Sequence, residues 1–370
     1  MKTRAAILRE VGQDWSVEEI ELDDPKEGEI LVKTMAAGMC HSDEHAHDGT
    51  MPVPLPIVGG HEGAGEVIAL GPGVTEFEVG DHISCSFIPS CGKCTWCAQG
   101  MQNLCDLGMH LMEPGMIDGT VRHHDKDGND LTPLLKLGTF SEHMVLSVDS
   151  AIKVQKDVPP GPAALVSCGV TTGYGSAVNR AEVGAGDTVV IVGCGGLGHA
   201  AIQGAKVAGA KNVVAVDPSE FKRESAESFG ATHSAASMEE AMELVGGMTL
   251  GVMADSVILT PGVLTGDMIA PAQFLTRKGG TIVATAVANA MDMDVQLNLF
   301  EFAMMNKELK GCLFGSTAPR KEIPHLLSMY QAGQLKLDEM ITNTYTLDQV
   351  NEGYADMLAN KNVRGVIMFD

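Results

Sequence analysis

The spacing of apolar residues changes along the chain and divides it into two parts. In the first 160 residues, short β-type runs such as 30–34 and 65–70 are separated by turn signals such as Gly71-Pro72-Gly73. This pattern predicts a β-rich, barrel-like domain.

Further along, apolar strands alternate with helical segments. Strands that are apolar throughout are typical of a parallel sheet with both faces covered. The alternation predicts a doubly wound α/β sheet. The expected elements are strands at 188–192, 212–216 and 280–284, a helix at 200–208, and, after further helices, a last strand at 365–369.

Composition narrows the classes of function. The 370 residues exceed one ordinary hydrophobic core, so two domains are expected. Lys and Arg total 25 against 48 Asp and Glu, and the net charge of −23 argues against nucleic acid or an anionic membrane as a partner. The chain has no run of about 18 apolar residues and no signal-peptide pattern, so a cytoplasmic location is expected.

Four of the nine cysteines lie close together. Cys91, Cys94 and Cys97 are separated by two residues each, and Cys105 follows. Four thiolates complete the tetrahedron of a zinc ion and leave no position for substrate, so a structural zinc is expected. An iron–sulfur cluster and plain buried thiols are the alternatives, but there is no second cysteine set of the ferredoxin type.

A second potential metal set is dispersed along the chain. Cys40, His61 and Cys168 come from three separate segments. Each of them alone is more readily explained as a core or turn residue. Together, two thiolates and one imidazole form the ligand set of a catalytic zinc with an open fourth position.

A glycine-rich turn follows the strand at 188–192. Gly193-Cys-Gly195-Gly-Leu-Gly198 opens a helix, which is the context of a dinucleotide-binding turn. Asp217 ends the next strand, where a carboxylate accepts hydrogen bonds from the adenosine ribose and disfavours a 2′-phosphate, so NAD is expected over NADP. Lys222 and Arg223 nearby weaken that preference, unless they are solvated helix residues. The expected cofactor-binding residues of this region are Gly193, Gly195, Gly196, Leu197, Gly198, Asp217 and Lys222.

In this order, the motifs resemble those of the zinc-containing medium-chain alcohol dehydrogenases over nearly the whole chain. Phrases such as Gly38-Met39-Cys40-His41-Ser42-Asp43 look most like the bacterial N,N-dimethyl-4-nitrosoaniline (NDMA)-dependent members. The resemblance implies an α/β protein with a GroES-like β-rich catalytic domain and a Rossmann NAD-binding domain. The implied bounds are 1–169 with 313–370 for the catalytic domain, including a zinc lobe at about 85–110, and 170–312 for the Rossmann domain.

The resemblance also implies a role for each residue around the dispersed set, and two zinc ions per chain. Asp43 would orient the imidazole of His61, and Glu62 would lie behind the metal. Ser42 would take the proton of the alcohol and His45 would pass it towards solvent. The alternative for His45 is a plain exposed loop residue.

Further residues are implied to bind the cofactor and the substrate. His41 and Arg364 would face the pyrophosphate of NAD, and Thr172 would lie against the nicotinamide ring. Phe87 would line the alcohol pocket. The segment 109–140 resembles the long loop of dimeric relatives, so a homodimer is expected, with a larger homo-oligomer as the alternative.

The implied reaction is reversible hydride transfer between a primary alcohol/aldehyde pair and NAD, with zinc acidifying the hydroxyl. The NDMA-dependent group holds NAD tightly, as nicotinoproteins, and passes electrons to an external acceptor, for which mycofactocin is the proposed natural partner. Two alternatives remain. One is an ordinary NAD-exchanging alcohol or S-(hydroxymethyl)glutathione dehydrogenase, and the other is a non-catalytic NAD-binding structural or regulatory protein.

The other histidines and cysteines receive no functional role. The stretch 109–136, rich in Gly, Asp and His, is expected to be a long surface excursion. Residues expected on the surface are His47, His110, His123 and His124, and those expected to be buried thiols are Cys85, Cys194 and Cys312.

Overall fold

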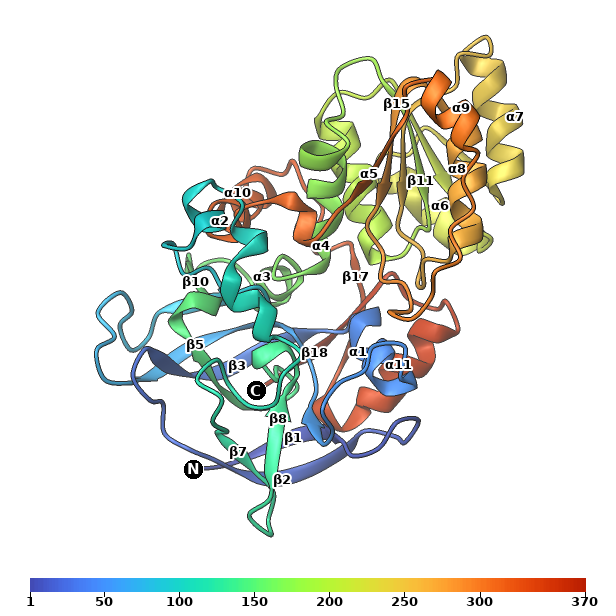
Figure 1. The fold of residues 1–370 in the computed structure, drawn as a ribbon. Helices are drawn as coiled ribbons and strands as arrows, with labels where there is room; N and C mark the ends of the chain where they lie inside the picture. Colours follow the sequence, from blue (N-terminus) through green and yellow to red (C-terminus); the bar gives the residue numbers. More distant parts are fainter. The chain divides into compact units, whose positions relative to one another are not determined.

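The computed structural model describes residues 1–370 and divides into two units (Figure 1). Unit 1 comprises Met1–Cys168 and Thr317–Asp370, and unit 2 comprises Gly169–Ser316. Unit 1 is rich in β-strands, whereas unit 2 alternates strands and helices around a parallel sheet. The predicted α/β fold class, with one β-rich part and one doubly wound part, is confirmed.

Five strands of unit 1 close into a barrel in the order β1-β2-β7-β8-β4. Its apolar interior is built from small and branched side chains, among them Ile7, Ile20 and Leu131, which are at most 1% exposed. Alternation of such residues with polar ones along each strand directs one face inward. The strands are β1 Lys2–Leu8, β2 Ser16–Leu22, β4 Ile57–Val58, β7 His123–His124 and β8 Asp130–Pro133.

A second sheet of unit 1 carries the segments that build the candidate site. Its strand order is β10-β6-β5-β3-β18-β17, and β9 also pairs with β3. The last strand of the chain pairs antiparallel with β3, so that Val366 lies opposite Gly38. The strands are β3 Glu29–Gly38, β5 Glu62–Leu70, β6 His82–Cys85, β9 His143–Ser147, β10 Ala151–Val154, β17 Ile341–Tyr345 and β18 Arg364–Met368.

The helices of unit 1 are short, except for α10. The α-helices are α1 His41–Asp48, α2 Thr95–Ala98, α3 Pro160–Leu165, α10 Pro319–Gln331 and α11 Val350–Leu358. The 3₁₀ turns are η1 Gln102–Leu104, η2 Asp106–His110, η3 Leu134–Lys136, η4 Val148–Ser150 and η8 Leu347–Gln349.

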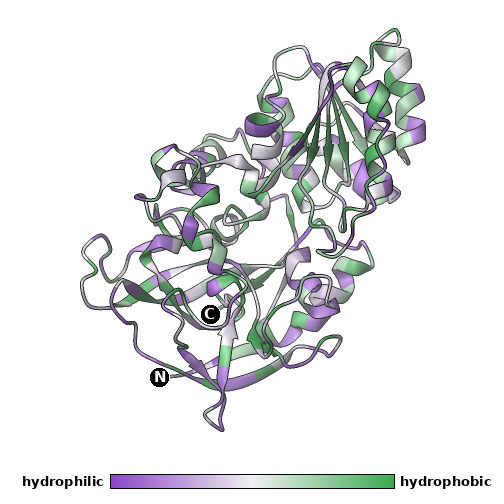
Figure 2. Cartoon of the chain, viewed as in Figure 1, coloured by the Kyte–Doolittle hydropathy of each residue, from purple (hydrophilic) through white to green (hydrophobic).

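Unit 2 is built on six parallel strands in the order β13-β12-β11-β14-β15-β16. Figure 2 shows its central strands as hydrophobic along their length and its helices as mixed, as expected for a sheet covered on both faces. The strands are β11 Thr188–Val192, β12 Asn212–Val216, β13 His233–Ala235, β14 Ala254–Leu259, β15 Thr276–Ala284 and β16 Glu308–Gly311. The helices and turns are α4 Gly169–Gly175, η5 Ser176–Arg180, α5 Gly196–Val207, α6 Glu220–Phe229, α7 Met238–Met248, η6 Gly266–Met268, α8 Ile269–Leu275, α9 Leu299–Met304 and η7 Phe314–Ser316.

The prediction of a surface excursion at 109–136 is confirmed for 109–120, where most residues are exposed, and is wrong for the barrel strands that follow. The stretch supplies β7 and β8 to the barrel, and Arg122 within it is fully buried. The Arg122 guanidinium donates to both carboxylate oxygens of Glu29, over 2.7 and 2.8 Å, and to Asp118 over 2.8 Å. A buried cation needs such partners, and they tie the stretch to β3.

His123 corrects the prediction of a surface histidine. Its side chain is 0% exposed, and neither ring nitrogen has a hydrogen-bond partner. Burial, with smaller contributions from His124 and Arg122, lowers the pKa of His123 to about 4, so the ring is neutral in the folded protein.

Two of the three leftover cysteines are fully buried, as predicted. Cys85 and Cys194 are 0% exposed, whereas Cys312 is half-buried. No helix has both the length and the apolarity that crossing a membrane requires.

Candidate active site and metal centres

The four clustered cysteines form one compact site on a loop-rich lobe of unit 1. Their sulfur atoms all lie within 4.8 Å of one another. Cys94 caps α2, since its sulfur accepts the backbone N–H of Cys97 at 3.5 Å. In the same way the sulfur of Cys91 accepts from Cys94 N at 3.3 Å, and that of Cys105 from Cys91 N at 3.4 Å.

The electrostatics of this lobe fit a bound cation. Backbone N–H groups, that of Cys97 above all, lower the pKa of Cys94 to about 6. Burial and the neighbouring sulfurs raise the pKa of Cys97 to about 12. Four sulfurs so close together cannot all be thiolates unless a cation offsets their charge, and four sulfur ligands are those of a closed zinc site.

The dispersed residues also meet in one place, within unit 1. The ligand atoms of Cys40, His61, Glu62 and Cys168 lie within 4.8 Å of one another. His61, Glu62 and Cys168 are buried, and Cys40 is half-buried. Three chain segments thus bring two thiols and one imidazole to a single point.

Local backbone geometry explains how the histidine reaches this point. Gly60 has φ +84°, and a Cβ there would lie 2.5 Å from the side chains of both Phe140 and Thr139. A Cβ at Gly59 would lie 2.4 Å from Trp15. Only glycine allows so close a passage, which sets His61 at the start of β5.

Asp43 holds the imidazole in a defined orientation. Its Oδ1 lies 3.0 Å from Nδ1 of His61 and accepts the Gly60 N–H at 3.1 Å, while Oδ2 accepts the Cys40 N–H at 3.3 Å. Nε2 of His61 is buried and has no hydrogen-bond partner. An orphaned ring nitrogen beside two thiols is the donor that a metal ion would use.

The two thiols of this site are strongly inequivalent. The hydrogen bond between them lowers the pKa of Cys40 well below its usual value and raises that of Cys168 well above. His61 and Arg364 also lower the pKa of Cys40. This polarity favours a thiolate at Cys40, the form in which cysteine binds metal.

Glu62 forms a buried ion pair with Arg364, a partnership that sequence reasoning missed. The Arg364 guanidinium donates to Glu62 and, at 3.2 Å, to the carbonyl of Met39. A Cβ at Gly38 would lie 2.1 Å from the Glu62 carboxylate, so glycine leaves the room that the pair occupies. Burial nevertheless raises the pKa of Glu62 to about 7. No local signal could have revealed a pair separated by 302 positions.

The residues predicted to move the proton lie on α1. Ser42 is half-buried, with its Oγ 3.8 Å from the Cys40 sulfur. His45 lies on helix α1 and its side chain is only 2% exposed, so the alternative of an exposed loop residue is wrong. The His41 and His45 ring centroids are 6.2 Å apart.

Phe87, predicted to line the substrate pocket, contacts the same centre. Its ring lies edge-on to His61, with centroids 6.0 Å apart and an interplanar angle of 85°. It also packs, half-buried, against an apolar cluster that contains Phe140 and Leu135. Phe87 therefore forms an apolar wall beside the imidazole of His61.

Unit 2 carries the glycine turn between β11 and α5. Gly193 has φ +95°, and a Cβ there would lie 2.5 Å from the Thr260 carbonyl. A Cβ at Gly198 would lie 1.9 Å from the Gly193 carbonyl, whereas one at Gly195 would meet nothing within 4 Å. The outer glycines thus permit the turn and the close packing, and the middle one leaves open space above the start of α5. Gly196 and Leu197 form the first turn of that helix.

The carboxylate of Asp217 is bound to the turn. It accepts the backbone N–H of Cys194 at 2.8 Å and that of Ser219 at 2.9 Å. Arg223 donates to the Asp217 carbonyl at 2.7 Å, and Lys222 is half-buried nearby on α6. Thr172 lies on α4 and is 9% exposed.

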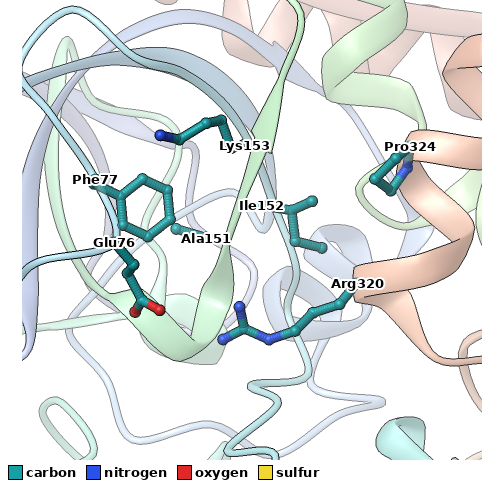
Figure 3. Close-up of a pocket in the computed structure, with 7 residues that line it drawn as sticks. All are labelled: Glu76, Phe77, Ala151, Ile152, Lys153, Arg320 and Pro324. Carbon is teal, nitrogen blue, oxygen red and sulfur yellow. The ribbon is translucent and has the colours of Figure 1, made fainter.

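One cavity of unit 1 does not involve any of these residues. It has a volume of about 230 Å³ and lies beside β10 and α10, lined by charged and apolar side chains (Figure 3). Arg320 from α10 reaches the Ser90 and Val148 carbonyls at 3.3 Å. The Lys153 ammonium lies 5.7 Å from the Phe77 ring centroid. None of the residues that line the cavity belongs to either cluster of potential metal ligands.

Comparison with known proteins extends over the whole chain. Residues 26–156 match the family model described as alcohol dehydrogenase GroES-like domain, and residues 196–332 match the one described as zinc-binding dehydrogenase. The chain is 49% identical over 368 residues to an NDMA-dependent alcohol dehydrogenase of Amycolatopsis methanolica, covering 100% of this chain and 99% of the relative. It is also 49% identical over 371 residues to alcohol dehydrogenase B of Mycobacterium tuberculosis, with the same coverage.

The fold is similar to that of solved enzymes. The crystal structure of benzyl alcohol dehydrogenase from Acinetobacter calcoaceticus matches with a TM-score of 0.91 and 28% identity, covering 100% of both chains. The predicted combination of a GroES-like domain with a Rossmann domain is therefore confirmed, and so is the family resemblance.

Proposed function

The chain belongs to the zinc-dependent medium-chain alcohol dehydrogenases, and we propose that it oxidises a primary alcohol with an NAD molecule that stays bound between turnovers. Alcohol dehydrogenase activity with zinc and NAD follows from the family. The proposal adds the residues that act, the retention of NAD and the need for an external acceptor.

The observation that carries the proposed site is the orphaned Nε2 of His61 between two thiols. Cys40, His61 and Cys168 would hold the catalytic zinc, and the four-cysteine lobe would hold the structural zinc. When bound, zinc supplies Lewis acidity towards the alcohol hydroxyl, and NAD supplies the hydride acceptor.

The chain's own residues bind, orient and move a proton. Asp43 keeps His61 in one tautomer and orientation through the 3.0 Å contact at Nδ1. Ser42 Oγ accepts the hydroxyl proton of the alcohol, and His45 passes it outward. Phe87 excludes water from the apolar side of the site. Loss of that proton and of a hydride converts the alcohol to an aldehyde.

The remaining predicted residues would bind NAD. The glycine turn at 193–198 would hold the pyrophosphate, with Asp217 and Lys222 near the adenosine ribose. His41 and Arg364 would add positive charge towards the pyrophosphate, and Thr172 would support the nicotinamide. The Arg364 side chain already pairs with Glu62 of the candidate metal site.

Retention of NAD rests on the 49% identity to an NDMA-dependent relative. A resident NADH must be re-oxidised in place, which requires an external two-electron acceptor of the mycofactocin type. The test is to desalt the purified protein, add alcohol alone and record its absorbance. A persistent reduced-nicotinamide band, with NDMA-coupled turnover in the absence of added NAD, is the expected result. Strict dependence on added NAD would refute retention and leave an ordinary exchanging dehydrogenase.

We propose that the chain forms a homo-oligomer, for which unit 2 offers a surface. Residues 291–304 expose several large apolar side chains, including Met293 at 100%, Phe300 at 78% and Leu299 at 70%. The edge strand β16 follows directly. Exposed apolar patches of this kind commonly mark protein interfaces. Light scattering should give a multiple of 38.9 kDa that Phe300→Glu reduces, whereas a monomeric wild type would refute the proposal.

A further inference from the structure

Lys136 is a buried cation that no part of the proposed reaction uses. Its side chain is 2% exposed, although lysine is rarely buried without a carboxylate partner. Its ammonium donates to the backbone carbonyls of Glu113 at 2.6 Å and Gly115 at 2.9 Å, with Pro114 at the 3.5 Å limit. Three carbonyl oxygens match the three N–H donors of an ammonium. We call this set of contacts the lysine clamp.

The backbone around the lysine clamp is strained. Leu135 has φ +49° and Lys136 has φ +64°, so two consecutive non-glycine residues lie in the left-handed region. Such a conformation persists only where surrounding contacts impose it, and it clusters at functional sites. Glycine would fit the backbone at residue 136 without strain, but it could not make the clamp.

The clamp joins two segments that both pack into the apolar cluster against which Phe87 packs. Leu134 and Leu135 belong to the apolar cluster against which Phe87 and Leu111 pack. Phe87 in turn lies edge-on to His61. Leu111 precedes the clamped carbonyls by two residues, and it is half-buried like Phe87. The ammonium therefore sets the spacing between the turn at 134–136 and the segment at 111–115.

We propose that Lys136 is a positioning residue that fixes the width of the alcohol pocket and so determines which alcohols are accepted. The inference rests on the proposed function, since it assumes that Phe87 and the metal site bind the alcohol. Without the ammonium, the carbonyls at 113–115 lose their donors, and the segment that carries Leu111 is no longer fixed against the turn. Selectivity by alcohol size then falls, because a hydrophobic pocket discriminates through close packing.

The test compares wild type with Lys136→Met, which keeps the side-chain length but removes the charge. KM and kcat are measured for ethanol, 1-butanol and benzyl alcohol. We expect the spread of kcat/KM across this panel to narrow about 10-fold, which is the discrimination that one well-packed methylene group provides. The change should appear in KM and not in kcat. An unchanged order and spread in the variant would overturn the proposal.

A matched control separates selectivity from loss of stability. Lys307 in unit 2 is likewise a buried lysine, 7% exposed, and its ammonium donates to the Gln273 carbonyl at 2.7 Å. Lys307→Met should lower thermal stability and leave the alcohol profile as in wild type. An equal narrowing in both variants would mean that the profile follows stability alone, and Lys136 would then have no positioning role.

Lys136→Gly provides a second test if Lys136→Met does not fold. It removes the clamp and relieves the left-handed strain, so folding should survive. Hydrogen exchange should then accelerate at the amides of 111–116, and the alcohol profile should flatten as with methionine. If neither variant folds, Lys136 serves stability and the proposal is wrong. If wild type has no zinc-dependent alcohol oxidation, the proposed function itself has failed.

Discussion

The two candidate metal centres of unit 1 are built in opposite ways. The cysteine lobe takes all its ligands from residues 91–105, and backbone N–H groups of the same stretch serve its sulfurs. The second centre collects Cys40, His61 and Cys168 from three segments, and distant side chains support its ligands. A local site holds its own shape, whereas a dispersed site depends on the fold around it.

The difference in support matches the difference in expected chemistry. Four sulfurs close the lobe, which leaves zinc there no position for a substrate. The second centre offers two sulfurs and one imidazole, with Phe87 beside His61 and with Glu62 paired to Arg364. Substitutions at the lobe should therefore reduce stability, and those at the second centre should reduce turnover.

The largest effect is expected at the second centre itself. Cys40→Ser should lower kcat by about 10³-fold or more, because several kcal/mol of Lewis-acid stabilisation correspond to about three factors of ten. Metal analysis should show loss of one zinc per chain, with circular dichroism unchanged. Cys312→Ser, at a half-buried cysteine outside both clusters and outside the glycine turn, is the control. Full activity of Cys40→Ser with both zinc ions retained would show that the ligand assignment is wrong.

Asp43→Asn tests the support of the imidazole. The amide has a single acceptor oxygen, so it cannot serve both the His61 and Gly60 contacts at Oδ1 and the Cys40 N–H at Oδ2 as the carboxylate does. We expect a loss of about 10–100-fold in zinc affinity and activity, measured by zinc titration and kcat. Asp125→Asn is the matched control, since Asp125 accepts backbone N–H groups far from either metal set. Equal losses in the two variants would contradict a specific role for Asp43.

Cys97→Ser removes one sulfur from the cysteine lobe, and it should lower stability more than turnover. One zinc should be lost and the apparent Tm should fall by about 5 °C or more, while kcat at low temperature changes by less than about threefold. Scanning calorimetry and initial rates measure the two effects. If kcat falls as far as it does in Cys40→Ser, the two centres do not divide stability and catalysis between them.

The smallest effect is expected where the lobe meets the rest of unit 1. Arg320→Met removes hydrogen bonds to Ser90 and Val148 and a 3.6 Å ion pair with Asp149, which are all partly exposed. A stability loss of about 1 kcal/mol is expected, because partly exposed polar contacts contribute little. Denaturant titration measures it, and chelators should remove the lobe zinc faster. An unchanged rate of zinc loss would show that the lobe needs no such anchor.

The sequence predicted the local features and could not predict the long-range ones. The spacing of Cys91, Cys94, Cys97 and Cys105 indicates a single site because residues so close in the chain must remain close in space. The strand at 188–192 could likewise be predicted, because a short run that is apolar throughout is typical of a strand buried in a parallel sheet. Helix α5 begins earlier than predicted, at Gly196, because glycines in its first turn obscure the helical pattern.

The dispersed centre was joined only through family resemblance. Nothing in the chain near Cys40 indicates that Cys168 lies beside it, because the fold alone brings them together. The same holds for the pair of Glu62 with Arg364 and for the burial of Arg122 and Lys136. Polar residues in a Gly- and Asp-rich stretch are typical of a solvent-exposed loop. Their burial is favourable only because hydrogen-bond partners from other segments surround them.

The stability of unit 1 depends on pH through His123, which is buried in the barrel without a hydrogen-bond partner. A ring whose pKa falls from 6.5 to about 4 on folding is charged more readily in the unfolded chain. Its stability contribution is therefore complete above pH 6.5 and is lost as the pH falls towards 4, up to about 3 kcal/mol. Protons thus act as a ligand of the unfolded state, so acidification from pH 6.5 towards pH 4 should make unit 1 easier to unfold.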